Sequence, residues 1–297
     1  MSTVLDLHEP GPRGVPPLLA RLVDDAALFP PTAAPMADAV AGHLAARDTP
    51  HAGLVGFFLC PISRFGELVK QLRATPPDAP LPVSLIADTG LGGLPKAINT
   101  ALDNPLLLAV RLIEVPASSD VDASWLVQLM EFVPDDVVRV VEPRRGRPEW
   151  LDGVRLVAEA GCWPKLRCGG AATQSFPTVD EIAAFLAVTT GVGRSFKATA
   201  GLHHAVRHHD DDTGLTHHGL LNMLVATARA VAGDDVHDAL SSTDAPALAA
   251  ECAALDEQAA HAVREVFACY GSPSLAGPVS DLERFALLGG SSSTSPR

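Results

Sequence analysis

The segment LLLAVRLIEVPASSDVDASWLVQLMEFVPDDVVRVVEP (residues 106–143) decides the fold. It begins with a nearly continuous apolar run (106–116), continues with helically spaced apolar residues (122–133) and ends with a second apolar run (137–143). Such continuous apolar runs are typical of strands that are buried on both faces, as in a parallel sheet. The segment therefore predicts a strand–helix–strand unit.

The same alternation continues on both sides of this unit. Further strands are predicted at 22–29, 54–61, 82–88, 164–170, 195–201 and 236–242. Further helices are predicted at 35–47, 63–74, 93–103, 149–160, 178–190, 218–233 and 245–269. The helix at 178–190 opens with Thr178-Val-Asp-Glu181, a capping-box pattern. Together these segments make eight strand–helix units, the number that a closed (β/α)8 TIM barrel requires.

We therefore predict an α/β protein with one (β/α)8 barrel domain over residues 16–290. Residues 1–15 form a predicted N-terminal extension, and residues 291–297 form a tail that we expect to be disordered. The predicted strands at 22–29 and 236–242 have the weakest patterns. If either is not a strand, the alternative is an open, doubly wound parallel sheet.

Composition limits the class of protein. The 297 residues carry a net charge of -13 and 47% hydrophobic residues. A chain this acidic, without a basic stripe, is not expected to bind nucleic acid. It shows neither a signal-peptide pattern nor an apolar run of about 18 residues, so we expect no membrane partner. The five cysteines are odd in number and lack CxxC spacing, which indicates reduced thiols in a cytoplasmic protein.

Two lysines fall in buried-strand patterns near the carboxyl ends of predicted strands, where barrel enzymes place their chemistry. Lys165 shares a strand face with Arg167, and Lys197 shares one with Thr199. A buried lysine either pairs with an acid or loses its proton, and the neutral amine is a nucleophile. The two interpretations are therefore a catalytic amine and a structural ion pair with Glu114 or another acid.

Three acids, Asp88, Glu114 and Glu142, end or follow three consecutive predicted strands. Three carboxylates at one edge can hold Mg²⁺ or Mn²⁺ through oxygen ligands. The alternative is that they cap helices or pair with nearby arginines. Without a metal, Glu114 is a candidate acid–base residue and Glu142 a candidate substrate-binding residue.

Histidines are concentrated after the strand at 195–201. Six of the eleven histidines lie in residues 203–218. His203 and His204 follow Lys197-Ala-Thr-Ala-Gly201 directly, so we expect them at the mouth of the barrel as acid–base residues. His208 and His209, beside three aspartates, are expected in a solvated loop.

A further group is predicted to bind substrate. Gly169 and Gly170 form a turn that can present backbone N–H groups to an anion, and Arg167 beside them suits a carboxylate or phosphate. The alternative for the glycines is a simple turn. Thr199 and Arg64, which also follow predicted strands, complete the candidate substrate-binding group.

The run Lys197-Ala-Thr-Ala-Gly resembles the Lys-Thr-Ser-Thr-Gly strand of deoxyribose-phosphate aldolases, which are class I aldolases on a (β/α)8 barrel. In that family the run carries the Schiff-base lysine, a second lysine lies on the neighbouring strand, and an acid lies on an earlier strand. The resemblance implies that Lys165, Lys197 and Glu114 correspond to this set. The chain departs from the pattern because its run is on the later of the two strands and its acid is a glutamate. Which lysine forms the imine therefore stays open.

The strings DDAALFPP, KLRCGG and FKATAGLHH also resemble those of an uncharacterised bacterial protein family, which implies no function.

Three functions are compatible with these features. The first is a lyase of the aldolase type, without a cofactor, that acts on a small carbonyl metabolite carrying a phosphate or carboxylate. The second is an enolising lyase or isomerase that uses Mg²⁺ or Mn²⁺ and a lysine base. The third is a non-catalytic barrel stabilised by an ion-pair network. The expected partner is a small-molecule substrate, and a homodimer is compatible with the sequence.

Overall fold

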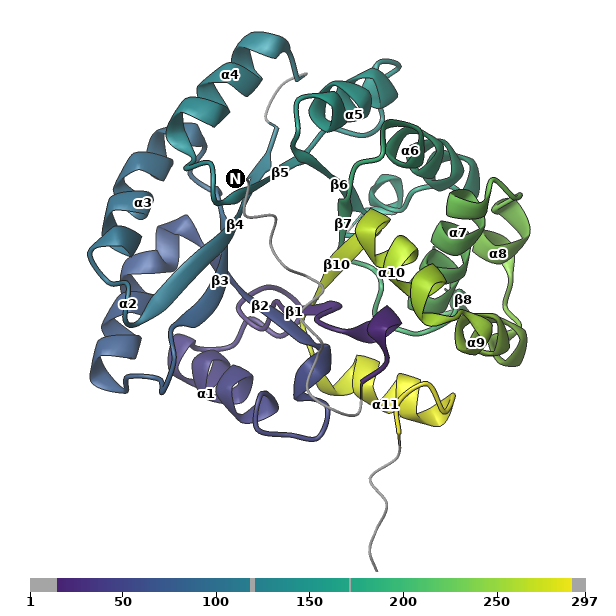
Figure 1. Ribbon diagram of the computed structural model, residues 1–297, viewed down its shortest axis with the longest axis horizontal. Coiled ribbons are helices and arrows are strands. Elements are labelled where there is room, and N and C mark those ends of the chain that lie inside the picture. Colours follow the sequence, from purple (N-terminus) through teal and green to yellow (C-terminus); the bar gives the residue numbers. More distant parts are fainter. Residues whose placement is uncertain (1–14, 118–120, 171, 290–297) are drawn as a thin grey trace, which may run out of the picture.

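A closed barrel of parallel strands, surrounded by helices, forms the body of the protein in a computed structural model (Figure 1). The structure describes residues 15–117, 121–170 and 172–289. Over these residues the barrel has eight strands in the closed order β1-β10-β7-β6-β5-β4-β3-β2. The predicted (β/α)8 barrel is therefore confirmed. The extension at 1–15, apart from residue 15, and the tail at 291–297 lie outside the described residues.

The barrel strands are short and mostly buried, as their apolar runs predict. They are β1 Val23–Asp25, β2 Val55–Pro61, β3 Leu81–Ile86, β4 Leu108–Pro116, β5 Val138–Glu142, β6 Trp163–Arg167, β7 Phe196–Thr199 and β10 Phe267–Ser272.

Helices connect the strands and cover the outside of the barrel (Figure 1). They are α1 Met36–Ala46, α2 Phe65–Ala74, α3 Leu94–Leu102, α4 Ala123–Phe132, α5 Trp150–Glu159, α6 Val179–Val192, α7 Leu220–Ala232, α8 His237–Ser241, α9 Ala245–Ala254, α10 Glu257–Val266 and α11 Ala276–Arg284. Helix α6 begins with the predicted capping box, in which Thr178 and Glu181 each bond the other's backbone N–H.

The last barrel strand is not where the sequence pattern placed it. The predicted strand at 236–242 is wrong, because these residues contain the short helix α8. The eighth strand is instead β10, which begins at Phe267, within the last predicted helix (245–269). Helix α10 ends at Val266, so no polar loop separates the helix from the strand. The apolar pattern therefore runs across the boundary without a visible break.

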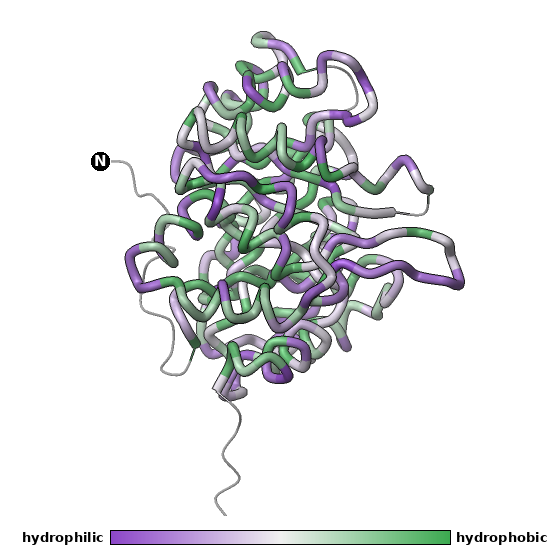
Figure 2. The backbone as a smooth tube through the Cα atoms, turned by 90° about the vertical axis from the view of Figure 1, so that its right-hand side faces the viewer, coloured by the Kyte–Doolittle hydropathy of each residue, from purple (hydrophilic) through white to green (hydrophobic). Residues whose placement is uncertain are grey.

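A two-stranded hairpin interrupts the connection between β7 and α7. Its strands, β8 His208–Asp210 and β9 Leu215–His217, are antiparallel, with His208 opposite His217. These residues were expected to form a solvated loop. A side view shows hydrophilic segments projecting from one side of the molecule (Figure 2).

The interior of the barrel has an apolar layer. A buried cluster joins side chains from five strands: Phe57, Leu112, Val140, Trp163, Ala268 and Cys269. Because side chains alternate between the faces of a strand, the residue two positions later also points inward. That residue is Glu114 after Leu112, Glu142 after Val140 and Lys165 after Trp163. The apolar layer therefore supports a polar layer nearer the carboxyl ends of the strands.

None of the helices in the described part of the chain has the length and apolarity needed to cross a membrane.

We expect Gly201→Ala to destabilise the fold more than Gly193→Ala. Both glycines have positive φ, 72° for Gly201 and 67° for Gly193, which costs an alanine about 1–2 kcal/mol. At Gly201 the added Cβ would also lie 2.3 Å from the carbonyl oxygen of Cys168, whereas the space around Gly193 is open. Urea denaturation of both variants measures the difference. Equal losses of stability would contradict close packing of the loops after β6 and β7.

Candidate active site

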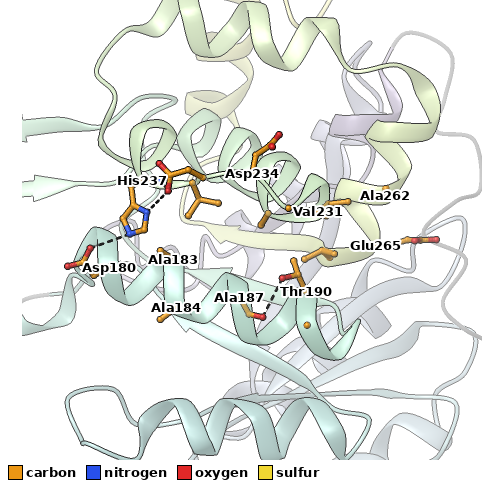
Figure 3. A pocket seen from close by; sticks show the side chains of 16 residues that line it. Asp180, Ala183, Ala184, Ala187, Thr190, Val231, Asp234, His237, Ala262 and Glu265 are labelled. Atoms are coloured by element: carbon orange, nitrogen blue, oxygen red, sulfur yellow. Dashed lines mark hydrogen bonds and ion pairs between the residues drawn. The ribbon is translucent and has the colours of Figure 1, made fainter.

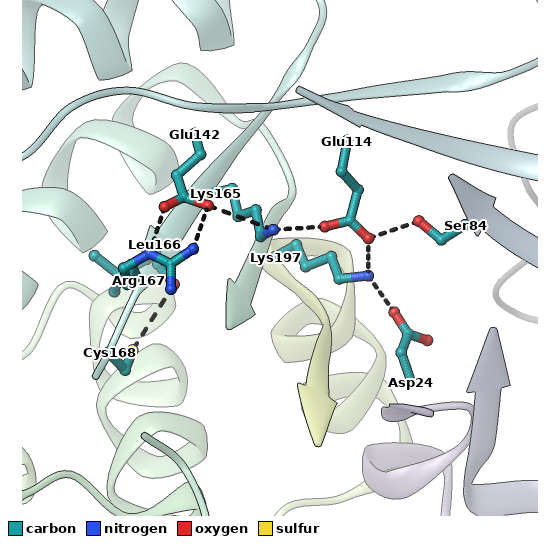
Figure 4. A network of polar contacts seen from close by, with 9 residues as sticks. All are labelled: Asp24, Ser84, Glu114, Glu142, Lys165, Leu166, Arg167, Cys168 and Lys197. Atoms are coloured by element: carbon teal, nitrogen blue, oxygen red, sulfur yellow. Dashed lines mark hydrogen bonds and ion pairs between the residues drawn. The ribbon is translucent and has the colours of Figure 1, made fainter. Parts of the chain in front are cut away.

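Six strands supply the charged and polar side chains of one network inside the barrel (Figure 4). The network residues are Asp24 on β1, Ser84 on β3, Glu114 on β4, Glu142 on β5, Lys165 and Arg167 on β6, and Lys197 on β7. Lys165 and Lys197 are direct neighbours in the register of β6 and β7. The structure therefore brings together five of the predicted site residues, namely Lys165, Lys197, Glu114, Glu142 and Arg167.

Lys197 is the buried cation of the network, with a side chain that is 0% exposed. Its Nζ donates to Asp24 Oδ2 (2.5 Å) and to Glu114 Oε1 (2.6 Å). Burial opposes the charge of this amine, but the two carboxylates outweigh it and raise the pKa of Lys197 above its ordinary value. Lys197 is therefore an ammonium group in this arrangement, with the role of a fixed positive charge.

Asp24 is held on its other side by the backbone. Its Oδ1 accepts the N–H of Phe57 (2.8 Å). Gly56 permits this approach, because a Cβ at that position would lie 2.2 Å from the same oxygen. Burial raises the pKa of Asp24, against the opposite effect of Lys197. Asp24 and Lys197 therefore form a tightly coupled buried pair.

Lys165 is slightly more exposed to solvent than Lys197, with a side chain that is 6% exposed. Its Nζ forms ion pairs with Glu114 Oε2 (2.8 Å) and Glu142 Oε2 (3.4 Å). Glu142 in turn receives Arg167 in a two-point contact, from Nε to Oε1 (2.6 Å) and from Nη2 to Oε2 (3.3 Å). The Arg167 side chain is 46% exposed. The network thus leads from the barrel interior to solvent.

Glu114 is the centre of the network. It accepts from Lys197 and from Ser84 Oγ (2.6 Å) through Oε1, and it faces Lys165 through Oε2. Burial alone would raise the pKa of this carboxyl, but the two lysines lower it to about 2. Glu114 is therefore ionised at neutral pH. The network contains three carboxylates and three cations, so its formal charges cancel.

Two members of the network are absent from the sequence-based selection. Asp24 and Asp25 are adjacent in the predicted strand at 22–29, and nothing in the sequence distinguishes the one that faces the barrel interior. Asp25 instead pairs with His43 of α1 (3.1 Å). Ser84 is the one hydroxyl in the apolar strand β3, and this interruption is the signal that identifies it.

The predicted metal ligands do not come together. Asp88 is exposed and accepts the backbone N–H of Ser63 (3.0 Å) and contacts the hydroxyl of that residue. Glu114 and Glu142 are bridged by the ammonium of Lys165, which occupies the position that a bound cation would take. Within the described residues, no group of three or more histidines, cysteines or acids is arranged to hold a metal ion. Asp88 thus holds the turn after β2 and does not cap the helix that follows its own strand.

His203 and His204 lie in a separate group of imidazoles. The ring of His204 meets that of His208 edge-on (4.5 Å), and His208 stacks on His217 (5.0 Å). Burial, with help from neighbouring histidines, lowers the pKa of His203. Among the described residues, neither His203 nor His204 makes a hydrogen bond or ion pair to the lysine–carboxylate network. No contact in the structure therefore supports the predicted role of His203 and His204 as acid–base residues of this network.

The other predicted substrate-binding residues have local roles. Arg64, the residue before α2, pairs with Glu67 in the first turn of that helix (2.9 Å). Gly169 packs on Gly201, where an added Cβ would lie 2.6 Å from the Cα of Gly201, and an added Cβ at Gly170 would meet Ser175 (2.8 Å). Both glycines therefore allow neighbouring segments to pack closely, and no turn is found at these two residues.

Thr199 ends β7, and its carbonyl accepts the N–H of Cys168 (2.8 Å). This bond ties the ends of β6 and β7 together beside the two lysines.

An open groove of about 840 Å³ lies outside the barrel, against α6, α7 and α10 (Figure 3). Alanines of α6, α7 and α10 line part of it, and the lining residue His237 pairs with Asp235 (2.7 Å) and Asp180 (3.5 Å). None of the network residues lines it. The groove is therefore a feature of the helical layer and not part of the candidate active site.

Comparisons with protein-family models, curated proteins and solved structures gave no significant match. The functional argument therefore depends on the barrel and on the geometry of the network.

We expect Lys197→Met to destabilise the protein by about 3–5 kcal/mol, because it leaves Asp24 and Glu114 buried with one cation fewer. Lys70→Met, at an exposed position of α2, is the matched control and should change stability by less than about 0.5 kcal/mol. Denaturation in urea at pH 7 measures both. Equal effects of the two substitutions would show that the buried ion pair does not support the fold.

The pH dependence of stability should depend on Glu114. Its pKa falls from an ordinary 4.5 to about 2 on folding, so its stabilising effect is complete above about pH 4.5 and is lost as the pH falls toward 2. The shift corresponds to an effect on the order of 3 kcal/mol. We therefore expect the stability difference between wild type and Glu114→Gln to shrink as the pH is lowered from 6 to 3. Parallel curves of unfolding free energy against pH would contradict this assignment.

Proposed function

We propose that the chain is an enzyme of the lyase class that binds a small carbonyl compound as an imine on Lys165. The supporting observation is the contrast between the two lysines. Both lysines are buried between two carboxylates, but Lys197 has no exposed surface, whereas the side chain of Lys165 is 6% exposed and lies on β6, beside the exposed Arg167 at its carboxyl end. That end of the barrel is where enzymes of this fold place their chemistry.

The first step of the proposed reaction is activation of the amine. A proton passes from Lys165 Nζ to Glu114 Oε2, 2.8 Å away, and the neutral amine attacks the substrate carbonyl. Loss of the ammonium charge removes one of the two cations that lower the pKa of Glu114. The carboxylate thus becomes a stronger base as the nucleophile forms.

The later steps use the same groups. The carbinolamine takes a proton from Glu114, loses water and becomes an iminium ion. Glu142 removes the proton of a hydroxyl on the β-carbon, the bond between the α- and β-carbons breaks, and its electron pair moves into the iminium to form an enamine. Glu142 then returns its proton to the α-carbon of the enamine, which becomes an iminium ion again. Water hydrolyses this iminium, which releases the second product and restores the ammonium of Lys165.

Arg167 is suited to bind the substrate. Its guanidinium is exposed at the end of the network, and its contact with Glu142 orients it. A planar guanidinium binds carboxylate or phosphate groups through two parallel hydrogen bonds. This favours a substrate with such a group beside its carbonyl.

The second candidate is a non-catalytic barrel, and the charge balance of the network favours it. Each lysine has carboxylate partners, and formal charges cancel. A fully paired network of this kind is also found in proteins where it has a structural role only.

Trapping with borohydride distinguishes the two candidates. The protein is reduced in the presence of small aldehydes, ketones and sugar phosphates, with and without EDTA, and its intact mass and modified peptide are determined. We expect an adduct on Lys165 that EDTA does not prevent and that Lys165→Arg abolishes, while Lys70→Arg retains it.

An adduct confined to Lys197 would assign the nucleophile to the other lysine. No adduct with any of these compounds would exclude the imine mechanism and leave the structural interpretation. Adduct formation that requires a divalent metal would contradict the proposed chemistry, because no step of it uses one.

A further inference from the structure

A second cavity lies outside the lysine–carboxylate network, beside the connection from β7 to α7. Its volume is about 260 Å³. The loop after β7, the start of α9 and the end of α11 line it, and the lining contains two arginines, two histidines and one aspartate: Arg207, Arg284, His204, His208 and Asp281. None of the network residues is part of this lining, so the cavity is a separate candidate site.

Arg207 is half-buried in this lining and fixed in position. Its Nη1 donates to Nδ1 of His218 (3.1 Å), whose Nε2–H donates to the carbonyl of Pro177 (2.7 Å). The backbone N–H of Arg207 donates to Asn222 Oδ1 (2.8 Å). Its contacts are therefore with neutral groups, and among the described residues no carboxylate forms an ion pair with its guanidinium.

Arg284 supplies the second guanidinium, at the end of α11. Its Cζ lies 5.4 Å from the centre of the Phe285 ring, which also lines the cavity. Arg284 likewise forms no ion pair with a carboxylate in the described part of the chain. Two arginines thus line one small cavity, and in the described part of the chain neither has the carboxylate partner that Arg64, Arg145 or Arg229 has.

The one acid of the lining is already engaged. Asp281 Oδ2 accepts the backbone N–H of Ala205 (2.7 Å). The Nδ1–H of His208 donates to the carbonyl of Val206 (3.2 Å), and the His208 ring meets that of His204 edge-on. Two arginines against one aspartate leave a local excess of one positive charge, in a chain whose net charge is -13.

We infer that this cavity binds a small oxyanion of the phosphate class, with Arg207 and Arg284 as its cationic ligands. Guanidinium groups match the oxygens of a phosphate through paired, charge-assisted hydrogen bonds. The volume is slightly below the roughly 300 Å³ of the smallest drug-sized pockets. Inorganic phosphate or a small phosphomonoester therefore fits, whereas a nucleotide does not.

Isothermal titration with inorganic phosphate at pH 7.5 and constant ionic strength tests this inference. All titrations use the Arg167→Gln background, so that the guanidinium proposed to bind the acidic group of the substrate does not contribute, and we expect saturable binding of one phosphate per chain. Arg284→Gln should weaken binding at least about tenfold, because it removes a charge-assisted contact. Arg155→Gln, which removes the same charge from an exposed position of α5, is the matched control and should bind like the background protein.

Further titrations distinguish the two sources of the phosphate group. Methyl phosphate that binds as tightly as inorganic phosphate indicates a site for phosphorylated metabolites, and much weaker binding indicates a site for the free ion. Succinate tests whether any dianion suffices, and it should bind more weakly than either.

Three outcomes would overturn the inference: no saturable binding of phosphate, equal loss of binding in Arg284→Gln and Arg155→Gln, or phosphate binding that Arg284→Gln leaves unchanged. Arg207→Gln provides a second variant, with circular dichroism as the check on its folding. Because no network residue lines the cavity, Lys165→Arg should bind phosphate like the background protein, so failure of the imine proposal and failure of this one are separable.

Discussion

The interior of this barrel depends on the ion pairs that the Glu114 carboxylate forms with two lysines. The lysines lie on neighbouring strands, and all three groups are buried. An unpaired charge at this depth would cost several kcal/mol, so each member of the set requires the others. Asp24 completes the pairing for Lys197 from a position 173 residues earlier in the chain. Closure of the barrel is what makes that contact available.

The charged layer is unusual for a barrel interior, which branched aliphatic residues normally fill. Here an apolar layer that includes Leu112 and Trp163 fills one part of the interior, and charged residues fill the next layer toward the carboxyl ends of the strands. Exposure increases from Lys197 through Lys165 to Arg167. The strands that supply the apolar core therefore also carry a row of charged side chains whose exposure to solvent increases along the row. The proposed function depends on this difference in exposure. It gives Lys197 the role of a fixed positive charge and Lys165 the role of the amine that reacts with substrate.

The sequence alone was sufficient for most of the barrel. The first seven barrel strands, from β1 to β7, were predicted with boundaries that differ by a few residues, because continuous apolar runs and helical spacing are local properties of the chain. The eighth strand was misplaced because Val266 and Phe267 join helix and strand without a polar loop. The hairpin β8–β9 was not foreseen, since its polar and charged residues lack the alternation of a buried strand.

For the site, sequence position identified Lys165, Lys197, Glu114, Glu142 and Arg167, because the carboxyl ends of parallel strands must meet at one end of a barrel. Sequence did not decide the partners within that set, or exclude Asp88 and the histidines at 203 and 204 from it. Those outcomes depend on which side chains face inward and on how the loops pack after the strands end. Only the closed sheet determines these distances, because it brings residues from β1, β4 and β7, which are not paired with one another, into contact inside the barrel, and no local periodicity contains that information.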